Sequence, residues 1–290
     1  MMHKLQDQGC AACQDLGYLT KPGTPWATAV VCPQCSQCPP ECDGTGRLLT
    51  RDERGRTYVT ACPCAALKGR VARYNRARLP AAYHGKTVES FEATNAEQRA
   101  VKHWLLAFQS GGMPGGRGIL MLGNPGIGKT HLLTGILRFL VLERGLDCRY
   151  VDAFHLLEQL KATFEAKSGT SALMSEVTRI PILAIDELGK SRTSGWQAEV
   201  LDQIISHRYN QGLTTFATSN FGPRKNGANA PPGRSAGGAD ASSKWAQLAQ
   251  RESLEDRIGA RIYSRLMEMC KPFLINGDDR RLRDTSGSAR

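Results

Sequence analysis

Residues 116–140 read GRGILMLGNPGIGKTHLLTGILRFL, and positions 123–130 of this stretch fit the pattern G-x-x-x-x-G-K-[ST]. Glycines allow the backbone to turn tightly and to aim several N–H groups at one point, and a helix that starts there adds the positive end of its dipole. Such a loop suits the phosphates of a nucleotide. Lys129 would reach the β- and γ-phosphates, and the hydroxyl of Thr130 would hold a Mg²⁺ ion.

The residues around this loop have the context that the pattern requires. The apolar run 119–122 predicts a parallel strand buried on both faces, and the apolar stripe over 132–140 predicts a helix that ends near Gly145. A glycine-rich turn that binds nothing would not need this strand–loop–helix order. We therefore expect ATP to contact the consecutive residues Gly123, Asn124, Pro125, Gly126, Ile127, Gly128, Lys129, Thr130 and His131.

The chain has 290 residues, enough for one large domain and a small one, with a formal net charge of +11 and a pI near 9.3. The basic excess favours a polyanionic partner, although the basic residues are spread out and many would simply be solvated. No apolar run approaches the ~20 residues of a membrane span, and the N-terminal MMHKLQDQGC lacks the apolar core of a secretory signal. We expect a cytoplasmic protein without membrane contact.

Eight of the ten cysteines lie between residues 10 and 64, in two sets with similar spacing. In each set an opening pair is followed by a closing pair, after 18 residues in one set and 19 in the other. Without an export signal, disulfides are less expected than metal binding. The pattern predicts two zinc sites, one with Cys10, Cys13, Cys32 and Cys35 as ligands and one with Cys38, Cys42, Cys62 and Cys64.

An interleaved pairing stays open, because Cys32, Cys35 and Cys38 form overlapping C-x-x-C units. Four sulfur ligands leave no position for water, so both sites would be structural. Eight thiolates and two Zn²⁺ ions together carry −4, which would bring the net charge from +11 to about +7. Segment 1–65 has few large apolar residues, so we expect it to need metal to fold and to serve as a partner-binding domain. Cys148 and Cys270 are expected to be buried or half-buried thiols.

The other half of the nucleotide site is expected at the ends of two later strands. One apolar run ends in Asp186-Glu187, where Asp186 would bind Mg²⁺ and Glu187 would activate the attacking water. Another strand ends in Thr218-Ser219-Asn220, and we interpret Asn220 as the residue that bonds the γ-phosphate or that water. Thr218 is the alternative candidate for this role. Asn220 could instead serve only to form a turn.

Apolar periodicity and turn residues divide the rest of the chain. A basic linker over 66–84 is interpreted as a solvated helix in preference to a nucleic-acid contact. Residues 222–243, rich in Gly, Ala, Pro and Ser, are predicted to be a mobile loop, and 284–290 a disordered tail. Further helices are expected at 65–78, 95–108, 153–164, 194–209 and 253–269, and further strands at 57–60, 148–151, 213–219 and 273–275.

Several motifs together resemble those of the AAA+ ATPases of the DnaC/DnaI bacterial helicase-loader group and of the IstB-type transposition ATPases. The resemblance covers residues 85–283, and the cysteine-rich N-terminus looks like the zinc-binding helicase-contact domain of DnaI-type loaders, here with two cysteine quartets. The motifs are Val88-Glu-Ser-Phe91, GNPGIGKTHL at 123–132, ILAIDELG at 182–189, ATSN at 217–220, RIYSRL at 261–266 and FLINGDDRR at 273–281.

The resemblance implies an α/β fold with a P-loop AAA+ core: a five-stranded parallel sheet, helices on both faces and no C-terminal lid. It implies that Arg265, in the S-R-L unit, is a finger that completes a neighbouring subunit's site in a ring or spiral. Arg257 and Arg261 are weaker candidates for the finger. The alternative is that the arginine forms only a surface salt bridge. It also implies contact with single-stranded DNA, which we place at 154–167.

Three functions are therefore weighed. The first is an ATP-driven replication factor that loads or remodels the replicative helicase on single-stranded DNA. The second is a transposition helper ATPase that acts with a transposase. The third is a zinc-dependent adaptor that uses ATP as a switch with little turnover. The zinc domain favours the first by resemblance, and the set Lys129, Asp186, Glu187 and Arg265 argues against the third.

Overall fold

The computed structural model describes residues 9–35, 38, 40–42, 44–111, 118–166, 170–192, 195–223 and 252–280. The chain divides into two compact units, one of residues 1–85 with 138–147 and one of residues 86–137 with 148–290. The predicted tail 284–290, and the predicted loop 222–243 beyond its first two residues, lie outside the described part.

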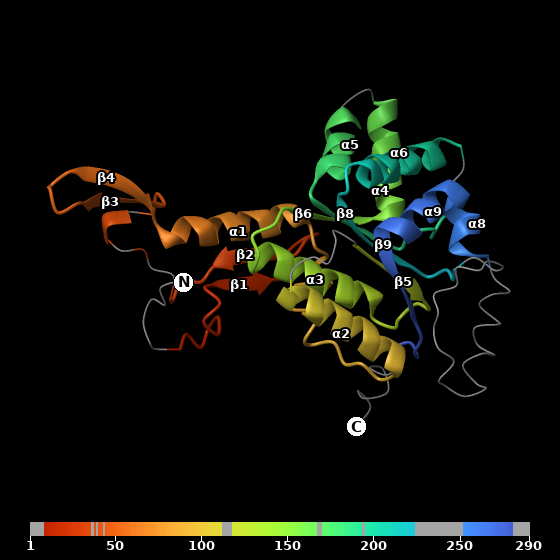
Figure 1. Cartoon of the computed structure of the whole chain (residues 1–290), viewed down its shortest axis with the longest axis horizontal. Helices are drawn as coiled ribbons and strands as arrows, with labels where there is room; N and C mark the ends of the chain where they lie inside the picture. The colour runs from red at the N-terminus through yellow and green to blue at the C-terminus, as the bar shows by residue number, and fades with distance from the viewer. Residues whose placement is uncertain are drawn as a thin grey trace. The chain divides into compact units, whose positions relative to one another are not determined.

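The second unit is built on a five-stranded parallel sheet, as predicted (Figure 1). The strand order is β6-β7-β8-β5-β9, and β5, β7 and β8 are buried along their whole length. Because β8 lies between β5 and β7, the segments that follow these three strands emerge side by side. The strands are β5 (Gly118–Gly123), β6 (Cys148–Asp152), β7 (Ile182–Asp186), β8 (Thr214–Ser219) and β9 (Cys270–Ile275).

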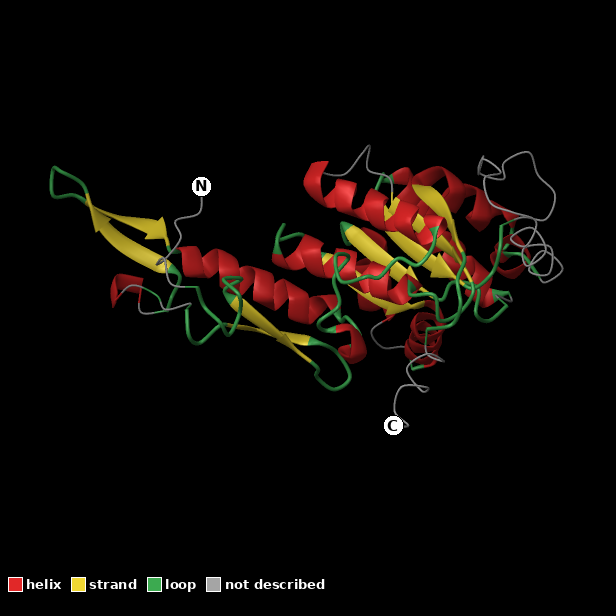
Figure 2. Ribbon diagram, turned by 90° about the horizontal axis from the view of Figure 1, so that it is seen from below, coloured by secondary structure: helices red, strands yellow, loops and turns green. Residues whose placement is uncertain are grey.

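Helices cover both faces of this sheet, as predicted (Figures 1 and 2). On one face lie α2 and α3, and Phe108 of α2 meets Phe216 of β8 with ring centroids 5.8 Å apart. The other face packs against the remaining helices through a core that includes Leu122, Ile185 and Ala217. The helices are α2 (Ala96–Gly111), α3 (Lys129–Leu142), α4 (Ala153–Glu165), α5 (Thr170–Arg179), α6 (Trp196–Asn210), α8 (Leu254–Ile258) and α9 (Ala260–Met269).

The prediction of one helix over 253–269 is wrong. Gly259 has φ 88° and ψ 151°, a conformation that ends α8 and starts α9 as a separate helix. The predicted apolar stripe is still buried, with Leu254, Ile258, Ile262 and Leu266 between 0% and 3% exposed. The structure also contains α5, for which the sequence suggested no element.

The first unit contains two antiparallel hairpins and one long helix, α1, which begins at Pro63 directly after Cys62. The first hairpin packs on α1, since the side chain of Asn75 bonds to both the N–H and the carbonyl of Ala29, at 2.7 and 3.1 Å. The elements are β1 (Tyr18–Lys21), β2 (Thr28–Val31), β3 (Arg47–Arg51), β4 (Thr57–Ala61), α1 (Pro63–Ala77) and the short 3-10 helices η1 (Pro40–Cys42) and η2 (Ala81–Tyr83).

Within the described part of the chain, no helix is both long enough and apolar enough to cross a membrane.

Candidate functional site

The loop between β5 and α3 has the backbone of an anion-binding loop. Gly126 has φ 76° and Gly128 has φ 97°, left-handed conformations that residues with a Cβ rarely adopt. Space is equally restrictive, because a Cβ on Gly128 would lie 2.5 Å from Cε2 of Phe91. The helix α3 begins at Lys129, so its first N–H groups face the loop.

Lys129 is 7% exposed and turns back into this loop. Its Nζ donates to the carbonyl oxygens of Gly123 (2.8 Å) and Asn124 (2.7 Å) and to Oδ1 of Asn220 (2.8 Å). Neutral oxygens surround the ammonium group at these positions, so a more negative acceptor such as a phosphate could replace them. The structure thus brings the predicted Asn220 to the predicted lysine, because β8 and β5 are neighbours.

Asp186 is buried at the end of β7, and three hydroxyl groups converge on its carboxylate. Thr130 donates to Oδ2 at 2.9 Å, Tyr150 donates to Oδ2 at 2.7 Å, and Thr218 donates to Oδ1. Thr130 and Asp186, the residues predicted to hold Mg²⁺, are therefore in contact. Tyr150 was not predicted, although a tyrosine within a buried strand signals a hydroxyl that needs a partner.

Glu187 follows directly and has φ 55°, an uncommon conformation for a residue with a side chain. Its N–H donates to Oγ1 of Thr218 at 3.0 Å, so Thr218 contacts both acidic residues. The Glu187 carboxylate accepts a 2.5 Å bond from Nζ of Lys190, and this bond raises the pKa of Lys190. Glu187 thus lies beside Asp186 with its carboxylate paired to a lysine three residues on.

The side chain of His131 faces the segment that precedes α2. Its Nε2 lies 2.9 Å from the carbonyl oxygen of Thr87 and 3.1 Å from Oγ of Ser90, and its ring meets Phe91 edge-on at 5.4 Å. Burial lowers the pKa of His131, which keeps the ring neutral at pH 7. With its ring engaged there, His131 offers a nucleotide mainly its backbone N–H.

Residues after β9 also reach the loop, a contact that the sequence did not suggest. The N–H of Arg280 donates to the carbonyl of Gly126 at 3.1 Å, and its guanidinium lies 4.4 Å from the ring centroid of Phe91. Arg280 also donates to Oε1 of Gln98 at 2.8 Å. This segment therefore borders the candidate nucleotide site.

The three C-terminal arginines have different surroundings. Arg265 on α9 donates from Nη1 to Oδ1 of Asp202 at 2.8 Å and to Oγ of Ser206 at 2.5 Å, both on α6. Arg261 pairs with the same aspartate at 3.4 Å, and its side chain is 71% exposed. Arg257 bonds to the turn after Glu187. Within the described residues, Arg265 is not brought to the phosphate loop of its own chain.

Each predicted cysteine quartet is gathered into one cluster, with all its sulfur atoms within 4.8 Å of one another. The interleaved pairing is not seen. In a tetrahedral site with Zn–S bonds of 2.3 Å, neighbouring sulfurs are about 3.8 Å apart. The structure has separations of 3.8 Å for Cys10–Cys32, 3.2 Å for Cys13–Cys35 and 3.6 Å for Cys42–Cys64.

The two clusters also repeat the same backbone arrangement. Gly17 and Gly46 occupy equivalent positions before the first strand of each hairpin, with φ 76° and 83°. The carbonyl of Gly17 accepts from the N–H of Cys32 at 2.8 Å, and that of Gly46 accepts from the N–H of Cys62 at 2.9 Å. The duplication visible in the sequence is therefore a duplication of structure.

The electrostatics of the clusters favour a bound cation. Burial opposes ionisation of Cys32, yet N–H donors of the turn, from Gln34 and Cys35, lower its pKa to about 7. Burial and then the neighbouring sulfurs raise the pKa of Cys64 to about 12. A divalent cation would relieve this conflict between adjacent sulfurs, and four sulfur donors suit Zn²⁺.

Comparison with known proteins finds a matching family and relatives that include named helicase loaders. The family model described as "IstB-like ATP binding protein" matches residues 67–223. The chain is 26% identical over 167 residues to "Replicative helicase loader DnaI" of Bacillus subtilis (strain 168), which covers 57% of this chain and 48% of DnaI. It is 31% identical over 100 residues to "Replicative helicase loader DnaC" of Escherichia coli (strain K12), covering 34% of this chain and 40% of DnaC. The chain thus spans about half or less of the length of these curated relatives.

Solved structures show the same fold. The crystal structure of the DnaC helicase loader superposes with a TM-score of 0.53 at 25% identity, covering 67% of this chain and 99% of that one. The replication initiator DnaA bound to AMPPCP and single-stranded DNA superposes with a TM-score of 0.51 at 15% identity, covering 73% and 58%, and shows the fold alone. Since the family model spans more than half of the residues, this chain belongs to the IstB-like ATP binding protein family, and its core has the P-loop AAA+ fold.

Proposed function

We propose that the protein hydrolyses ATP with Mg²⁺ at a site completed by a neighbouring subunit. The observation that carries this proposal is the convergence of Lys129, Thr130, Asp186 and Asn220 at the ends of three adjacent strands. Lys129 would bind the β- and γ-phosphates, and Thr130 with Asp186 would hold Mg²⁺. Glu187 would activate the attacking water, and Asn220 would orient that water or the γ-phosphate.

Arg265 would act in the neighbouring subunit's site. Its side chain is 21% exposed, so it is partly accessible at the surface of the second unit. Asp202 and Ser206 of α6 hold it there. An arginine inserted in trans stabilises the charge that spreads over the transferring phosphoryl group, an effect of ~10³–10⁵ in rate. The proposal therefore includes a homo-oligomer, in a ring or a spiral.

The process that this ATPase serves is the loading of the replicative helicase. Support comes from the relatives, because the DnaI and DnaC proteins that the chain resembles are named replicative helicase loaders. Further support comes from the two cysteine clusters, whose four-sulfur donor sets suit structural zinc and leave the first unit free for a binding role.

Within the first unit, the second hairpin is the surface best suited to a protein partner. Leu49 and Val59 lie directly opposite each other in the register of β3 and β4, and they are 65% and 61% exposed. In the first hairpin, by contrast, Tyr18 and Ala29 are 3% and 2% exposed because that hairpin packs on the chain itself. A cross-strand apolar pair left in water is typical of an interaction site.

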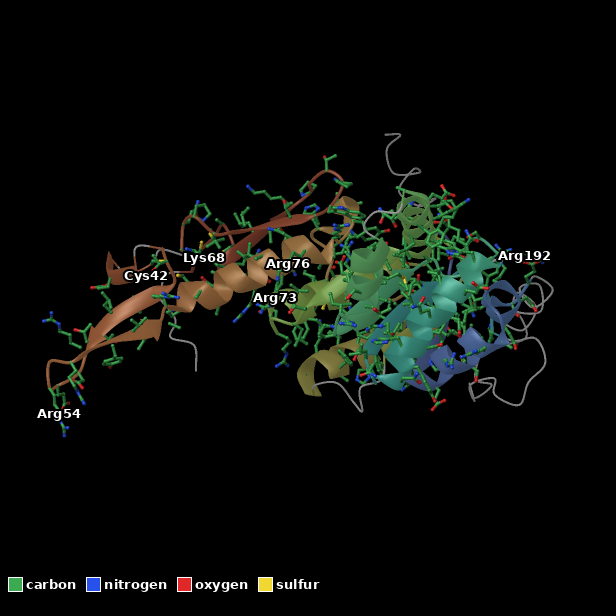
Figure 3. All side chains as sticks on the ribbon, turned by 90° about the horizontal axis from the view of Figure 1, so that it is seen from above. Cys42, Arg54, Lys68, Arg73, Arg76 and Arg192 are labelled. Carbon is green, nitrogen blue, oxygen red and sulfur yellow. The ribbon has the colours of Figure 1, made fainter. Side chains whose placement is uncertain are left out.

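Charge indicates the chemistry of the partner at this hairpin. Four arginines, one of them Arg54 at its tip, outnumber the two acidic residues Asp52 and Glu53 over residues 47–61 (Figure 3). We therefore place the replicative helicase on the Leu49–Val59 pair. The surface of the helicase that binds there should be partly apolar and partly acidic, to complement the hairpin.

Single-stranded DNA would contact the second unit at α4, within the region 154–167, of which Lys167 lies outside the described residues. Phe154 and Phe164 are 37% and 62% exposed, and the ring of Phe164 lies 6.2 Å from that of Trp196. Exposed aromatic rings stack on bases without regard to sequence. The alternative function, a transposition helper that acts with a transposase, has its support in the family description, which names the IstB type.

Steady-state ATP turnover and binding of a fluorescent ATP analogue test the site. Lys129→Ala should lose nucleotide binding, whereas Glu187→Gln should bind nucleotide and turn over at least about 100-fold more slowly. Arg265→Ala alone should bind ATP without efficient turnover, and mixing it with Lys129→Ala should restore part of the activity, because one variant supplies the finger and the other binds ATP. Unchanged turnover in Lys129→Ala or Glu187→Gln, or no recovery on mixing, would contradict the respective assignment.

A further inference from the structure

Arg257, on the short helix α8, is tied to the turn that follows Glu187. Its Nε donates to the carbonyl oxygen of Gly189 at 2.8 Å, and its Nη2 donates to the carbonyl oxygen of Lys190 at 2.7 Å. Its Nη1 pairs with Oε2 of Glu252 at 2.8 Å, and the guanidinium lies 4.6 Å from the ring centroid of Phe221. Each guanidinium nitrogen thus has a partner in the same chain.

The turn itself needs support from outside. Glu187 has φ 55°, a left-handed conformation that is unfavourable for a residue with a Cβ relative to ordinary backbone. Within the turn, the N–H of Lys190 donates to the carbonyl of Glu187 at 3.1 Å. The remaining restraints must come from neighbouring elements.

Several of those restraints are hydrogen bonds to three consecutive carbonyl groups. The carbonyl of Leu188 accepts from Oγ of Ser219 at 2.7 Å, and the next two, of Gly189 and Lys190, accept from Arg257. On the other side, the N–H of Leu188 donates to the carbonyl of Thr218 at 2.8 Å. Strand β8 therefore holds the start of the turn, and within the described part of the chain Arg257 supplies the two side-chain donors at its end.

We infer that Arg257 is a positioning residue for Glu187, which it serves by holding the backbone of residues 189–190. This inference rests on the proposed ATP hydrolysis, in which Glu187 activates water. It also makes Arg257 a weaker candidate than Arg265 for a finger in trans, because all three guanidinium nitrogens of Arg257 are engaged within its own chain, whereas the bonds described for Arg265 use Nη1 alone.

The contact suits arginine in particular. The planar guanidinium presents two donors at a fixed angle and so bridges adjacent carbonyls, whereas a lysine has one compact ammonium group and would hold one of them well. The side chain of Arg257 is 15% exposed, and its bond to the Gly189 carbonyl is partly buried, whereas its bond to the Lys190 carbonyl is exposed. Lysine at this position should therefore preserve the charge and only part of the restraint.

The chain offers a matched control in Arg192, which is labelled in Figure 3. Arg192 also pairs with the Glu252 carboxylate, and its side chain is 66% exposed. Among the described contacts it bonds to neither turn carbonyl. Arg192→Met and Arg257→Met therefore both remove an arginine from Glu252, and only the second releases the turn.

The experiment measures kcat and KM for ATP, affinity for a fluorescent ATP analogue, and thermal unfolding. Arg257→Met should lower kcat about 10- to 100-fold while nucleotide affinity stays within twofold, because misplacement of a catalytic group affects the chemical step. Arg257→Lys should recover part of the loss, and Arg192→Met should stay within twofold of the wild type. Should Arg257→Met fail to fold, Arg257→Lys carries the same comparison of kcat with affinity.

A double-mutant comparison separates positioning from general destabilisation. In the Glu187→Gln background, Arg257→Met should cause no further loss of turnover, since its effect acts through Glu187. The inference would be overturned by an undiminished kcat in Arg257→Met, or by a loss of kcat equal to that of Arg192→Met. It would also be overturned if the losses caused by Arg257→Met and Glu187→Gln multiplied in the double variant. Absence of turnover in the wild type would instead contradict the proposed ATPase, so the two failures are distinct.

Discussion

Arg208 is an arginine that the core encloses completely, and its described hydrogen bonds go to backbone carbonyls and one hydroxyl. Its shortest hydrogen bonds run from Nη2 to the carbonyl of Thr214 (2.6 Å), from Nη1 to the carbonyl of Ile180 (2.8 Å) and from Nε to Oγ1 of Thr215 (2.9 Å). Burial lowers the pKa of Arg208 to about 10, which leaves it charged at pH 7. The residue joins the end of α5 to β8, and it belongs to the folding of the core rather than to the candidate site.

Replacing Arg208 with alanine should destabilise the second unit by at least about 3 kcal/mol, because several buried carbonyls lose their donor at about 1–3 kcal/mol each. Chemical unfolding followed by tryptophan fluorescence measures this change. Arg179→Ala is the control, since Arg179 is exposed in the last turn of the same α5 and should shift stability by about 0.5 kcal/mol or less. Equal effects of the two substitutions would contradict this view of Arg208.

Several residues of the candidate site could be predicted at this scale and others could not. Lys129, Thr130 and the Asp186-Glu187 pair belong to local patterns in which a few consecutive residues perform one task. Tyr150 and Arg257 have no such pattern around them. They contact Asp186 and the turn after Glu187 across 36 and 67–68 positions of sequence, respectively, and only the folded chain brings them there.

At the scale of elements, the cysteine clusters and their hairpins form equivalent modules with different surroundings. In each, a glycine carbonyl accepts from the N–H of a cysteine of the cluster, and the hairpin runs between the two cysteine pairs. The first hairpin is fixed to α1 through Asn75 and to residues 138–147 through the 2.5 Å bond of Tyr18 to Glu143. The second cluster also adjoins α1, which begins at Pro63, between its last two cysteines.

Metal analysis of the purified protein should give two zinc ions per chain. Cys42→Ala should give one, because it breaks the second cluster and leaves the first intact, whereas Cys148→Ala should retain two, since Cys148 lies in β6 of the second unit. Chelation should unfold both hairpins, because four-sulfur sites of this size supply most of their module's folding free energy. One zinc in the wild type, or two in Cys42→Ala, would contradict the two-cluster structure.

Secondary structure could be predicted where the apolar periodicity is long. The prediction failed where a single residue ends a helix. The apolar stripe from Leu254 to Leu266 correctly identified the buried face, yet it could not reveal that Gly259 would take a left-handed conformation and divide the helix. The ten-residue helix α5, for which the sequence predicted no element, places Val177 in the core and packs Leu173 and Met174 against it, and Arg208 donates to the carbonyls near its end.

Considered as a whole, the protein combines the second unit, which contains the candidate nucleotide site, with the first unit, whose second hairpin exposes the Leu49–Val59 pair to solvent. Leu49 and Val59 are far more exposed than the equivalent part of the first hairpin. An internal duplication in which one copy is packed and the other is open indicates a division of tasks between the copies: the first copy is part of the protein's own structure, and the second is exposed to a partner, for which we proposed the replicative helicase above.

Binding of the purified replicative helicase to the full-length protein should weaken at least about tenfold in the double variant Leu49→Ser/Val59→Ser, since burial of each apolar side chain contributes about 1.5–3 kcal/mol. Val30→Ser, at an exposed position of the first hairpin, is the control and should stay within twofold. Zinc content should remain at two in both variants. If the double variant binds as tightly as the wild type, the contact lies elsewhere. If the wild type does not bind, the loader proposal itself is contradicted.

The five-stranded parallel sheet was implied by the family resemblance, whereas the phosphate loop, the Asp186-Glu187 strand end and the two cysteine quartets could be recognised in the sequence itself. These features are encoded locally, by glycines where the backbone must turn left-handed, by continuous apolar runs and by ligand spacing. Only the tertiary structure decided that Asn220 meets Lys129, that Tyr150 and Thr218 hold Asp186, and that Arg257 holds the turn after Glu187. The physical reason is that these contacts depend on the order β6-β7-β8-β5-β9 and on how helices pack over it, and strand order is a property of the whole chain rather than of any one segment.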